Sequence, residues 1–205
     1  MNILVVGATG PSGREVVAAA LAAGHKVTAF SRHPQNGGFT PEVRLVAGDV
    51  RDAAAVAAAI EGQDAVISTL GNNRSMKNAP PCADGIRNII AAMKAAGLKR
   101  LIALSAYGTG GAPLGLFGWI LSTLLAAVQR DKEAMEHLLE QSGLDWTAVR
   151  SPALYAKPKD APLAAATDIV LEGMASISTA EQGRWIVDEL TACRFVGKKP
   201  IIYRA

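Results

Sequence analysis

Short runs of apolar residues alternate along the chain with stretches in which apolar residues recur at helical spacing. The apolar runs predict seven strands, at residues 3–7, 26–30, 43–49, 64–71, 100–106, 145–154 and 200–204. The helical stretches lie between these strands and include 52–62 and 180–192, while residues 168–178 predict a hairpin. Strands that are joined through helices run parallel. The pattern therefore predicts an α/β fold with a doubly wound, mostly parallel sheet and helices on both faces.

Length and composition fit one domain that comprises residues 1–205, without repeats or linkers. Half of the 205 residues are hydrophobic, which is enough for a sizeable core. The formal net charge of +3 is not gathered in a basic patch, so we expect no nucleic-acid partner. Cys82 and Cys193 match no metal-ligand spacing, so we expect no metal and a reduced, cytoplasmic setting.

One apolar run, residues 113–128, is long but shorter than the roughly 20 residues that span a bilayer. Charged residues follow it, so we interpret it as a partly buried helix and expect no membrane partner. The first predicted strand begins within the first three residues, which leaves no room for a signal peptide. We expect a monomer or a weak homodimer.

Three glycines, Gly7, Gly10 and Gly13, join the first predicted strand to the first predicted helix. A tight turn there points free backbone N–H groups and the positive end of the helix outward, and the missing side chains let a ligand approach. The spacing G-x-x-G-x-x-G differs from the G-x-G-x-x-G of many dehydrogenases. Glycines also make ordinary tight turns, but this position after the first strand predicts a pyrophosphate site.

The end of the second predicted strand indicates which nucleotide is bound. Sites that prefer NAD usually carry an Asp or Glu there, which accepts hydrogen bonds from the ribose 2′-OH. This chain has Ser31 and Arg32 instead. An arginine can form a charge-assisted, bidentate bond to a 2′-phosphate, so we expect NADPH (NADP) as the cofactor. A solvated surface arginine is the alternative interpretation of Arg32.

Six segments together resemble the atypical branch of the short-chain dehydrogenase/reductase superfamily that contains NmrA-like proteins and biliverdin-IXβ or flavin reductases. They are GATGPSG, FSRHP, AGDVRD, GQDAVISTLG, GIRNIIAAMKAAGLKRLIALSA and EQSGLDWTAVRSPAL, and they follow the family's order through most of residues 1–154. The resemblance implies a Rossmann-like NAD(P)-binding domain. After about residue 155, only the general strand-helix-strand character is similar.

The resemblance also implies a cofactor site at the carboxyl ends of the strands, where such sheets bind ligands. The pyrophosphate would lie on the glycine turn, at Gly7, Thr9, Gly10, Pro11, Ser12 and Gly13. Further along, the implied contacts are Arg32 for the 2′-phosphate, Asp49 and Val50 for the adenine, Leu70 and Gly71 for the ribose near the nicotinamide, Ser105 beside the nicotinamide, and Pro152, Ala153 and Leu154 for its amide. Core packing is the alternative for Val50, Leu70 and Leu154.

The catalytic pair typical of the superfamily, a Tyr and a Lys spaced Y-x-x-x-K on one helix, is missing. Tyr155 and Lys159 have the spacing, but Pro158 would break a helix and they follow the sixth strand instead of the fifth. Tyr107 is on the expected loop but has Gly111 four residues later. Ser105 and Lys132 remain as candidate catalytic residues. Lys132 lies where this branch often has a Lys or His near the nicotinamide ribose, and a solvated lysine is its alternative.

The resulting functional hypothesis is an NADPH-dependent oxidoreductase that transfers hydride to a conjugated small-molecule acceptor, such as a flavin or a quinone. The cofactor carries the difficult chemistry, and such acceptors need only a weak acid. Residues of about 107–130 and 155–178 would form the substrate side, with the 113–128 run either as a lid or as a surface helix. The alternative hypothesis is a redox-sensing regulatory protein of NmrA type that binds NAD(P) with little or no catalysis.

Overall fold

The computed structural model describes residues 1–71, 82–109, 126–155, 157–158, 162–171 and 175–204. The elements are β1 (Asn2–Val6), α1 (Pro11–Ala22), β2 (Lys26–Ser31), the 3-10 helix η1 (Pro34–Gly37), β3 (Arg44–Ala47), α2 (Ala53–Ile60), β4 (Ala65–Ser68), α3 (Cys82–Ala95), β5 (Arg100–Ala106), α5 (Ala126–Glu140), β6 (Asp145–Ser151), β7 (Ala164–Ala166), α6 (Thr179–Ala192) and β8 (Ile201–Tyr203).

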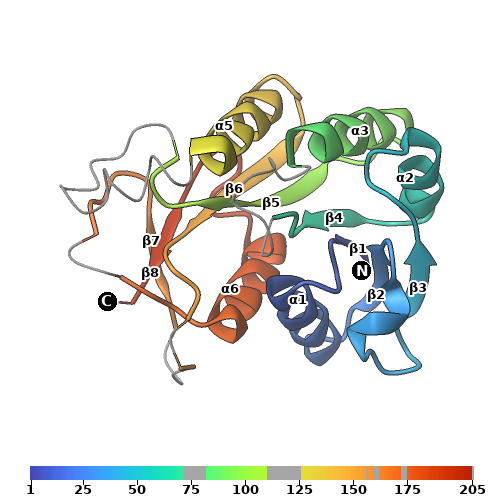
Figure 1. The fold of residues 1–205 in the computed structure, drawn as a ribbon, viewed down its shortest axis with the longest axis horizontal. Helices are drawn as coiled ribbons and strands as arrows, with labels where there is room; N and C mark the ends of the chain where they lie inside the picture. The colour runs from blue at the N-terminus through green and yellow to red at the C-terminus, as the bar shows by residue number, and fades with distance from the viewer. Residues whose placement is uncertain (72–81, 110–125, 156, 159–161, 172–174, 205) are drawn as a thin grey trace.

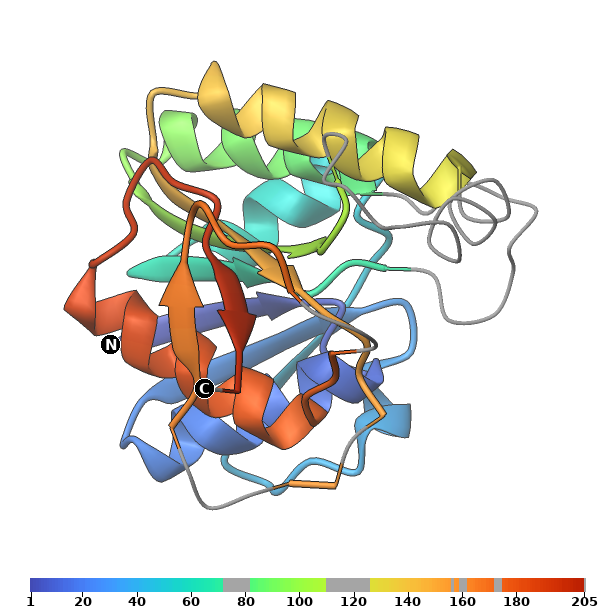
Figure 2. The same ribbon diagram turned by 90° about the vertical axis from the view of Figure 1, so that its left-hand side faces the viewer.

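The eight strands form one sheet in the order β3-β2-β1-β4-β5-β6-β8-β7. All neighbouring pairs are parallel except β7 and β8, which pair antiparallel at the edge. Helices α1 and α6 cover one face of the sheet, and α2, α3 and α5 cover the other (Figure 1). Figure 2 shows the sheet between these two layers. The predicted doubly wound, mostly parallel α/β fold is confirmed.

Alternate residues of the central strands supply two hydrophobic cores, one on each face. In β1, Ile3 and Val5 pack toward α1 and α6, whereas Leu4 and Val6 pack toward α2 and α3, and all four side chains are buried. Burying each such side chain stabilises the fold by roughly 1.5–3 kcal/mol. Gly183 lets α6 approach α1 closely, because a Cβ there would lie 2.8 Å from the carbonyl of Glu15.

The structure differs from the sequence-based prediction mainly after β6. Residues 168–178 were predicted to form a hairpin, but their described part contains no strand and only the isolated bridge between Ala153 and Ser176. The antiparallel partner of β8 is instead β7, whose alanine run carries no strand pattern. Most of the apolar run 113–128 lies outside the described residues. In the part of the chain that is described, no helix has the length and apolar character of a membrane span.

Candidate functional site

The carboxyl ends of β1 and β4 form the centre of the candidate site. From β1 the chain adds strands toward β3, and from β4 it adds them toward β6, so the strand order reverses between β1 and β4. Doubly wound sheets bind ligands at this point. Thr69 ties the two strand ends together, since its Oγ1 lies 2.9 Å from the Val6 oxygen and 3.1 Å from the Gly7 oxygen. The sequence analysis missed Thr69, because a threonine after a strand gives no signal of its own.

The glycine turn between β1 and α1 needs at least two of its glycines. Gly7 has φ of +80°, a left-handed conformation that favours glycine. A Cβ on Gly13 would lie 2.4 Å from the Gly7 oxygen and 2.7 Å from the Ala8 oxygen, so no side chain fits there. The turn is closed by a hydrogen bond from Gly10 N to the Gly7 oxygen at 3.0 Å. The predicted tight turn is therefore present.

Helix α1 starts on this turn without a side-chain cap. The first turn of α2 is capped by Asp52, that of α6 by Ser178, and that of α3 by Asp131 from a neighbouring helix. The first N–H groups of a helix have no partner within the helix. Helix α1 thus leaves these donors without a side-chain partner at the glycine turn, at the positive end of its dipole.

The end of β2 forms the next corner of the site. The Ser31 hydroxyl is buried and has no hydrogen-bond partner among the described residues. Arg32 is exposed, and no described residue pairs with its guanidinium. Arg14 links the glycine turn to η1, because its Nε donates to the Thr9 oxygen at 3.1 Å and its Nη2 donates to the Asn36 oxygen at 2.9 Å. An unpaired buried hydroxyl costs free energy that a polar ligand here would recover.

A compact wall follows the ends of β3 and β4. Val50 is buried, and its carbonyl accepts a hydrogen bond from Asn88 Nδ2 at 2.9 Å. Gly85 leaves room for this wall, since a Cβ there would lie 2.6 Å from Leu70 Cδ1 and 2.8 Å from Val50 Cγ2. The Asp49 carboxylate accepts from the Arg51 backbone N–H and so stabilises its own turn. Val50 belongs to the hydrophobic core on this face of the sheet, and Leu70 is half-buried beside it.

Lys132 of α5 is buried, so its interpretation as a solvated lysine is wrong. Its side chain is only 5% exposed. Its Nζ donates to the Leu70 oxygen at 2.8 Å and to the Leu104 oxygen at 2.5 Å. The Leu70 carbonyl follows the end of β4 and the Leu104 carbonyl lies within β5, so the ammonium links these two neighbouring strands near the candidate site. Nearby, burial raises the pKa of the Cys82 thiol to about 11 despite the opposing charge of Lys132.

Ser105 lies in β5 on the face that α5 covers, within a buried ionic network. Its Oγ donates to Glu136 Oε1 at 2.6 Å. Arg150 holds the same carboxylate through both oxygens, at 3.0 and 2.7 Å, and Lys199 lies 3.4 Å from it. Burial alone would raise the pKa of Glu136, but the hydrogen bonds from Arg150 and Ser105 and the two cations outweigh it and lower that pKa. The Ser105 hydroxyl therefore donates its hydrogen bond to an ionised carboxylate.

The segment after β6 borders a cavity of about 500 Å³ at the carboxyl edge of the sheet. Pro152 lines this cavity, while Ala153 and Leu154 are exposed beside it. Strand β6 ends before Pro152, which has no N–H to donate to a neighbouring strand. The opposite wall is made by residues 169–171 and 175–177.

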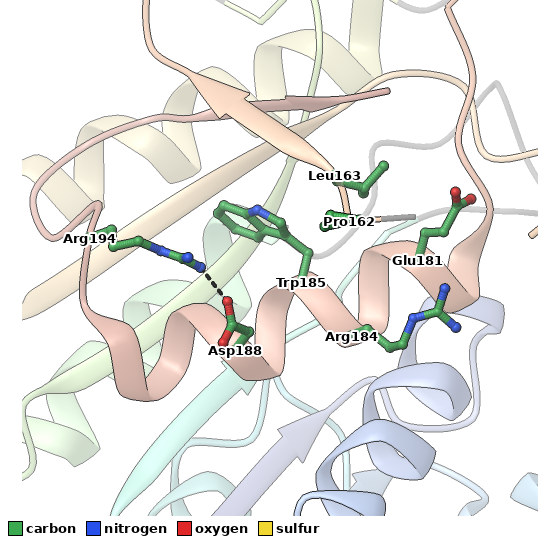
Figure 3. Close-up of a pocket in the computed structure, with 7 residues that line it drawn as sticks. All are labelled: Pro162, Leu163, Glu181, Arg184, Trp185, Asp188 and Arg194. Carbon is green, nitrogen blue, oxygen red and sulfur yellow. Dashed lines mark hydrogen bonds and ion pairs between the residues drawn. The ribbon is translucent and has the colours of Figure 1, made fainter. Parts of the chain in front are cut away.

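A second pocket, of about 340 Å³, is lined by side chains of α6 and by residues 162–163 (Figure 3). Trp185 forms its floor, and Pro162 and Leu163 form one wall. The Arg194 guanidinium is paired with Asp188 at 2.5 Å, and the Glu181 carboxylate is paired with Arg204. These opposite charges compensate each other, so the pocket offers no uncompensated anchor from either pair.

The sequence is similar to a known family of nucleotide-binding proteins and to several individual proteins. The sequence profile described as NAD(P)H-binding matches residues 7–192. An uncharacterised protein of Mycobacterium tuberculosis is 29% identical over 163 residues, which make up 78% of this chain and 16% of that protein. A 3-diazoavenalumate denitrifying reductase of a Streptomyces species is 34% identical over 117 residues, 51% of this chain and 38% of that protein. The chain spans well under two thirds of either relative.

The fold also matches solved structures. A short-chain dehydrogenase/reductase from Veillonella parvula, solved in complex with NADP, superposes with a TM-score of 0.83. The match covers 99% of this chain and 94% of that one at 18% sequence identity. At this identity the likeness establishes the fold alone.

Proposed function

Because the chain belongs to the NAD(P)H-binding family, we propose that it is an NADPH-dependent reductase that transfers hydride to a conjugated acceptor. The observation that carries this proposal is the uncapped start of α1 on a turn where Gly13 can bear no side chain. It lies at the point of the sheet where strand order reverses. Donors left unsatisfied in such a place suit the pyrophosphate of a dinucleotide.

The residues of this edge fit NADPH. The first-turn N–H groups of Ser12 and Gly13, with Thr9, Gly10 and Pro11, would hold the pyrophosphate. Arg32, which lacks a partner among the described residues, would bind the 2′-phosphate, and the orphan Ser31 hydroxyl is a further donor at the same corner. The wall formed by Val50, with Asp49 before it, would border the adenine.

The nicotinamide end would lie over β4, β5 and β6, near Leu70, Gly71, Ser105 and residues 152–154. When bound, the reduced nicotinamide supplies hydride. Lys132 would position this end, because it holds the Leu70 carbonyl, just beyond β4, and the Leu104 carbonyl, within β5. The Ser105 hydroxyl donates its hydrogen bond to Glu136, so its oxygen is left to accept a hydrogen bond from a ligand.

The proposal is tested by following NADPH oxidation with FMN and with a quinone as acceptors. We expect turnover well above the rate without protein. A protein that binds NADPH tightly but oxidises none with either acceptor would contradict a reductase.

The Ser105 hydroxyl donates its hydrogen bond to the ionised Glu136, so Ser105 is a poor proton donor for a substrate. This motivates a second candidate, an NAD(P)-binding redox sensor of NmrA type. A sensor would show that last result, binding without turnover. A cytoplasmic setting and a monomeric or weakly dimeric state remain predictions for either candidate.

A further inference from the structure

Three segments that are distant in the sequence build the cavity beyond β6. Its lining includes Pro152 after β6, Ser176 and Ile177 before α6, and Tyr203 and Arg204 at the end of β8. Residues 169–171 add apolar side chains to the polar ones of Ser176, Tyr203 and Arg204. The shape of the cavity therefore depends on how these segments are held together.

Arg204 connects the end of β8 to both of the other segments. Its Nε donates to Glu181 Oε1 at 2.9 Å and its Nη2 to Glu181 Oε2 at 2.5 Å, which attaches β8 to the first turn of α6. The same Nη2 donates to the Lys157 oxygen at 2.6 Å, which attaches the segment after β6. One guanidinium thus links three parts of the chain beside the cavity.

The carboxylate that Arg204 binds is itself fixed. Glu181 Oε2 accepts hydrogen bonds from the Ser178 backbone N–H at 2.9 Å and from the Ser178 hydroxyl at 2.7 Å. The Glu181 side chain is only 1% exposed, and the Arg204 side chain is 24% exposed. A carboxylate buried this deeply depends on its partner, because an uncompensated buried charge is costly. The ion pair is therefore part of the cavity wall.

The remaining two segments contact each other directly. The Ile177 backbone N–H donates to the Ala153 oxygen at 3.0 Å, and Ala153 forms an isolated bridge with Ser176. The three segments thus form a closed ring of contacts. In the sheet, β4, β5 and β6 lie between β1 and β8, so this ring is separate from the glycine turn that follows β1.

We infer that Arg204 is a positioning residue for the acceptor, because its ion pair with Glu181 holds the walls of this cavity at the separation in which the acceptor binds. The inference rests on the proposed reductase function and deepens it, since it names where the acceptor binds and what shapes that place. Apolar walls with a few polar groups suit a conjugated ring that carries oxygen substituents, of the quinone or flavin class.

The first experiment compares wild type with Arg204→Gln and Arg204→Lys. NADPH is the donor, and the acceptor is whichever of 2-methyl-1,4-naphthoquinone and FMN has the lower KM with wild type. We expect Arg204→Gln to raise the acceptor KM about tenfold or more, with kcat at saturation and the NADPH Kd each changed less than about threefold. Arg204→Lys keeps the charge and should restore part of the loss.

This pattern is specific to positioning of the acceptor, because a general loss of stability would not separate KM from kcat or spare the cofactor. Arg194→Gln is the matched control. It removes another arginine from an ion pair with α6, the one with Asp188, and Arg194 does not line this cavity. It should change neither the acceptor KM nor the NADPH Kd.

The second experiment tests whether Arg204 acts through Glu181. Glu181→Gln should fold, because glutamine also suits the third position of a capping box that starts at Ser178. We expect this variant to raise the acceptor KM about as much as Arg204→Gln does, and the double variant to raise it no further. Two independent effects would instead multiply, to about a hundredfold.

The outcomes separate the two claims. Absence of turnover by wild type with either acceptor would overturn the proposed function and this inference with it. Turnover by wild type together with an unchanged acceptor KM in Arg204→Gln would overturn the inference alone. So would an equal loss of NADPH affinity in that variant, or effects that multiply in the double variant.

Discussion

Gly13→Ala tests the glycine turn with the smallest possible side chain. The new Cβ would lie 2.4 Å from the Gly7 oxygen, 2.7 Å from the Ala8 oxygen and 2.8 Å from the Ala8 carbonyl carbon. All three neighbours are backbone atoms, so α1 and the turn must move apart by more than half an ångström. Such overpacking costs about 1–3 kcal/mol, and the lower entropy of the unfolded alanine chain recovers about 0.4–1 kcal/mol. We expect a net loss of stability of about 1–2 kcal/mol.

The same movement should turn the first N–H groups of α1 away from the pyrophosphate. We expect the NADPH Kd to rise more than tenfold, or roughly 1.4 kcal/mol, in calorimetric titrations of the folded variant. Gly10→Ala is the matched control for stability, because its Cβ would meet only the Gly7 oxygen at 3.3 Å and should cost much less. A folded Gly13→Ala protein with the affinity of wild type would refute the assignment of the turn to phosphate.

Three further predictions follow from single residues. Wild type should bind NADPH about ten- to a hundredfold more tightly than NADH, and Arg32→Ala should weaken NADPH alone, whereas equal losses for both cofactors would make Arg32 a mere surface charge. Hydrogen bonds from Arg204 lower the pKa of Glu181 to about 2. The ionised Glu181 therefore stabilises the folded protein fully above the ordinary glutamate pKa of about 4.3, and this stabilisation is lost as the pH falls toward 2. The difference in unfolding free energy between wild type and Glu181→Gln, measured in urea, should shrink over that pH range. Cys193 has a φ of 51°, a left-handed conformation that costs a non-glycine residue about 1–2 kcal/mol, so Cys193→Gly should raise stability by about 1 kcal/mol, with an unchanged or lower Tm as the contrary result.

Local features of the site could be predicted from the sequence because short-range patterns specify them. The three glycines after an apolar run specify a strand, a turn and a helix start, and Asp52 caps α2 because a carboxylate before a helix binds its first N–H groups. The NAD(P)-binding family was likewise predicted from several such segments in order, and the profile match confirms it.

Long-range contacts could not be predicted in the same way. The burial of Lys132 depends on carbonyls of Leu70 and Leu104 that only the folded sheet brings to it, so a lysine on an amphipathic helix gave no sign of it. The network of Ser105, Glu136 and Arg150 joins three separate elements for the same reason. Strand β7 was not predicted, because its three alanines show no alternation of apolar and polar residues. Its strand structure depends on its pairing with β8.

The most direct test of the central claim uses NADPH that carries deuterium at one or the other face of the nicotinamide C4. A reductase that holds the cofactor on the carboxyl edge of this sheet presents only one face to the acceptor. We predict a primary isotope effect on quinone reduction with one labelled form and none with the other. Equal effects with both forms, or NADPH oxidation no faster than without protein, would contradict the account.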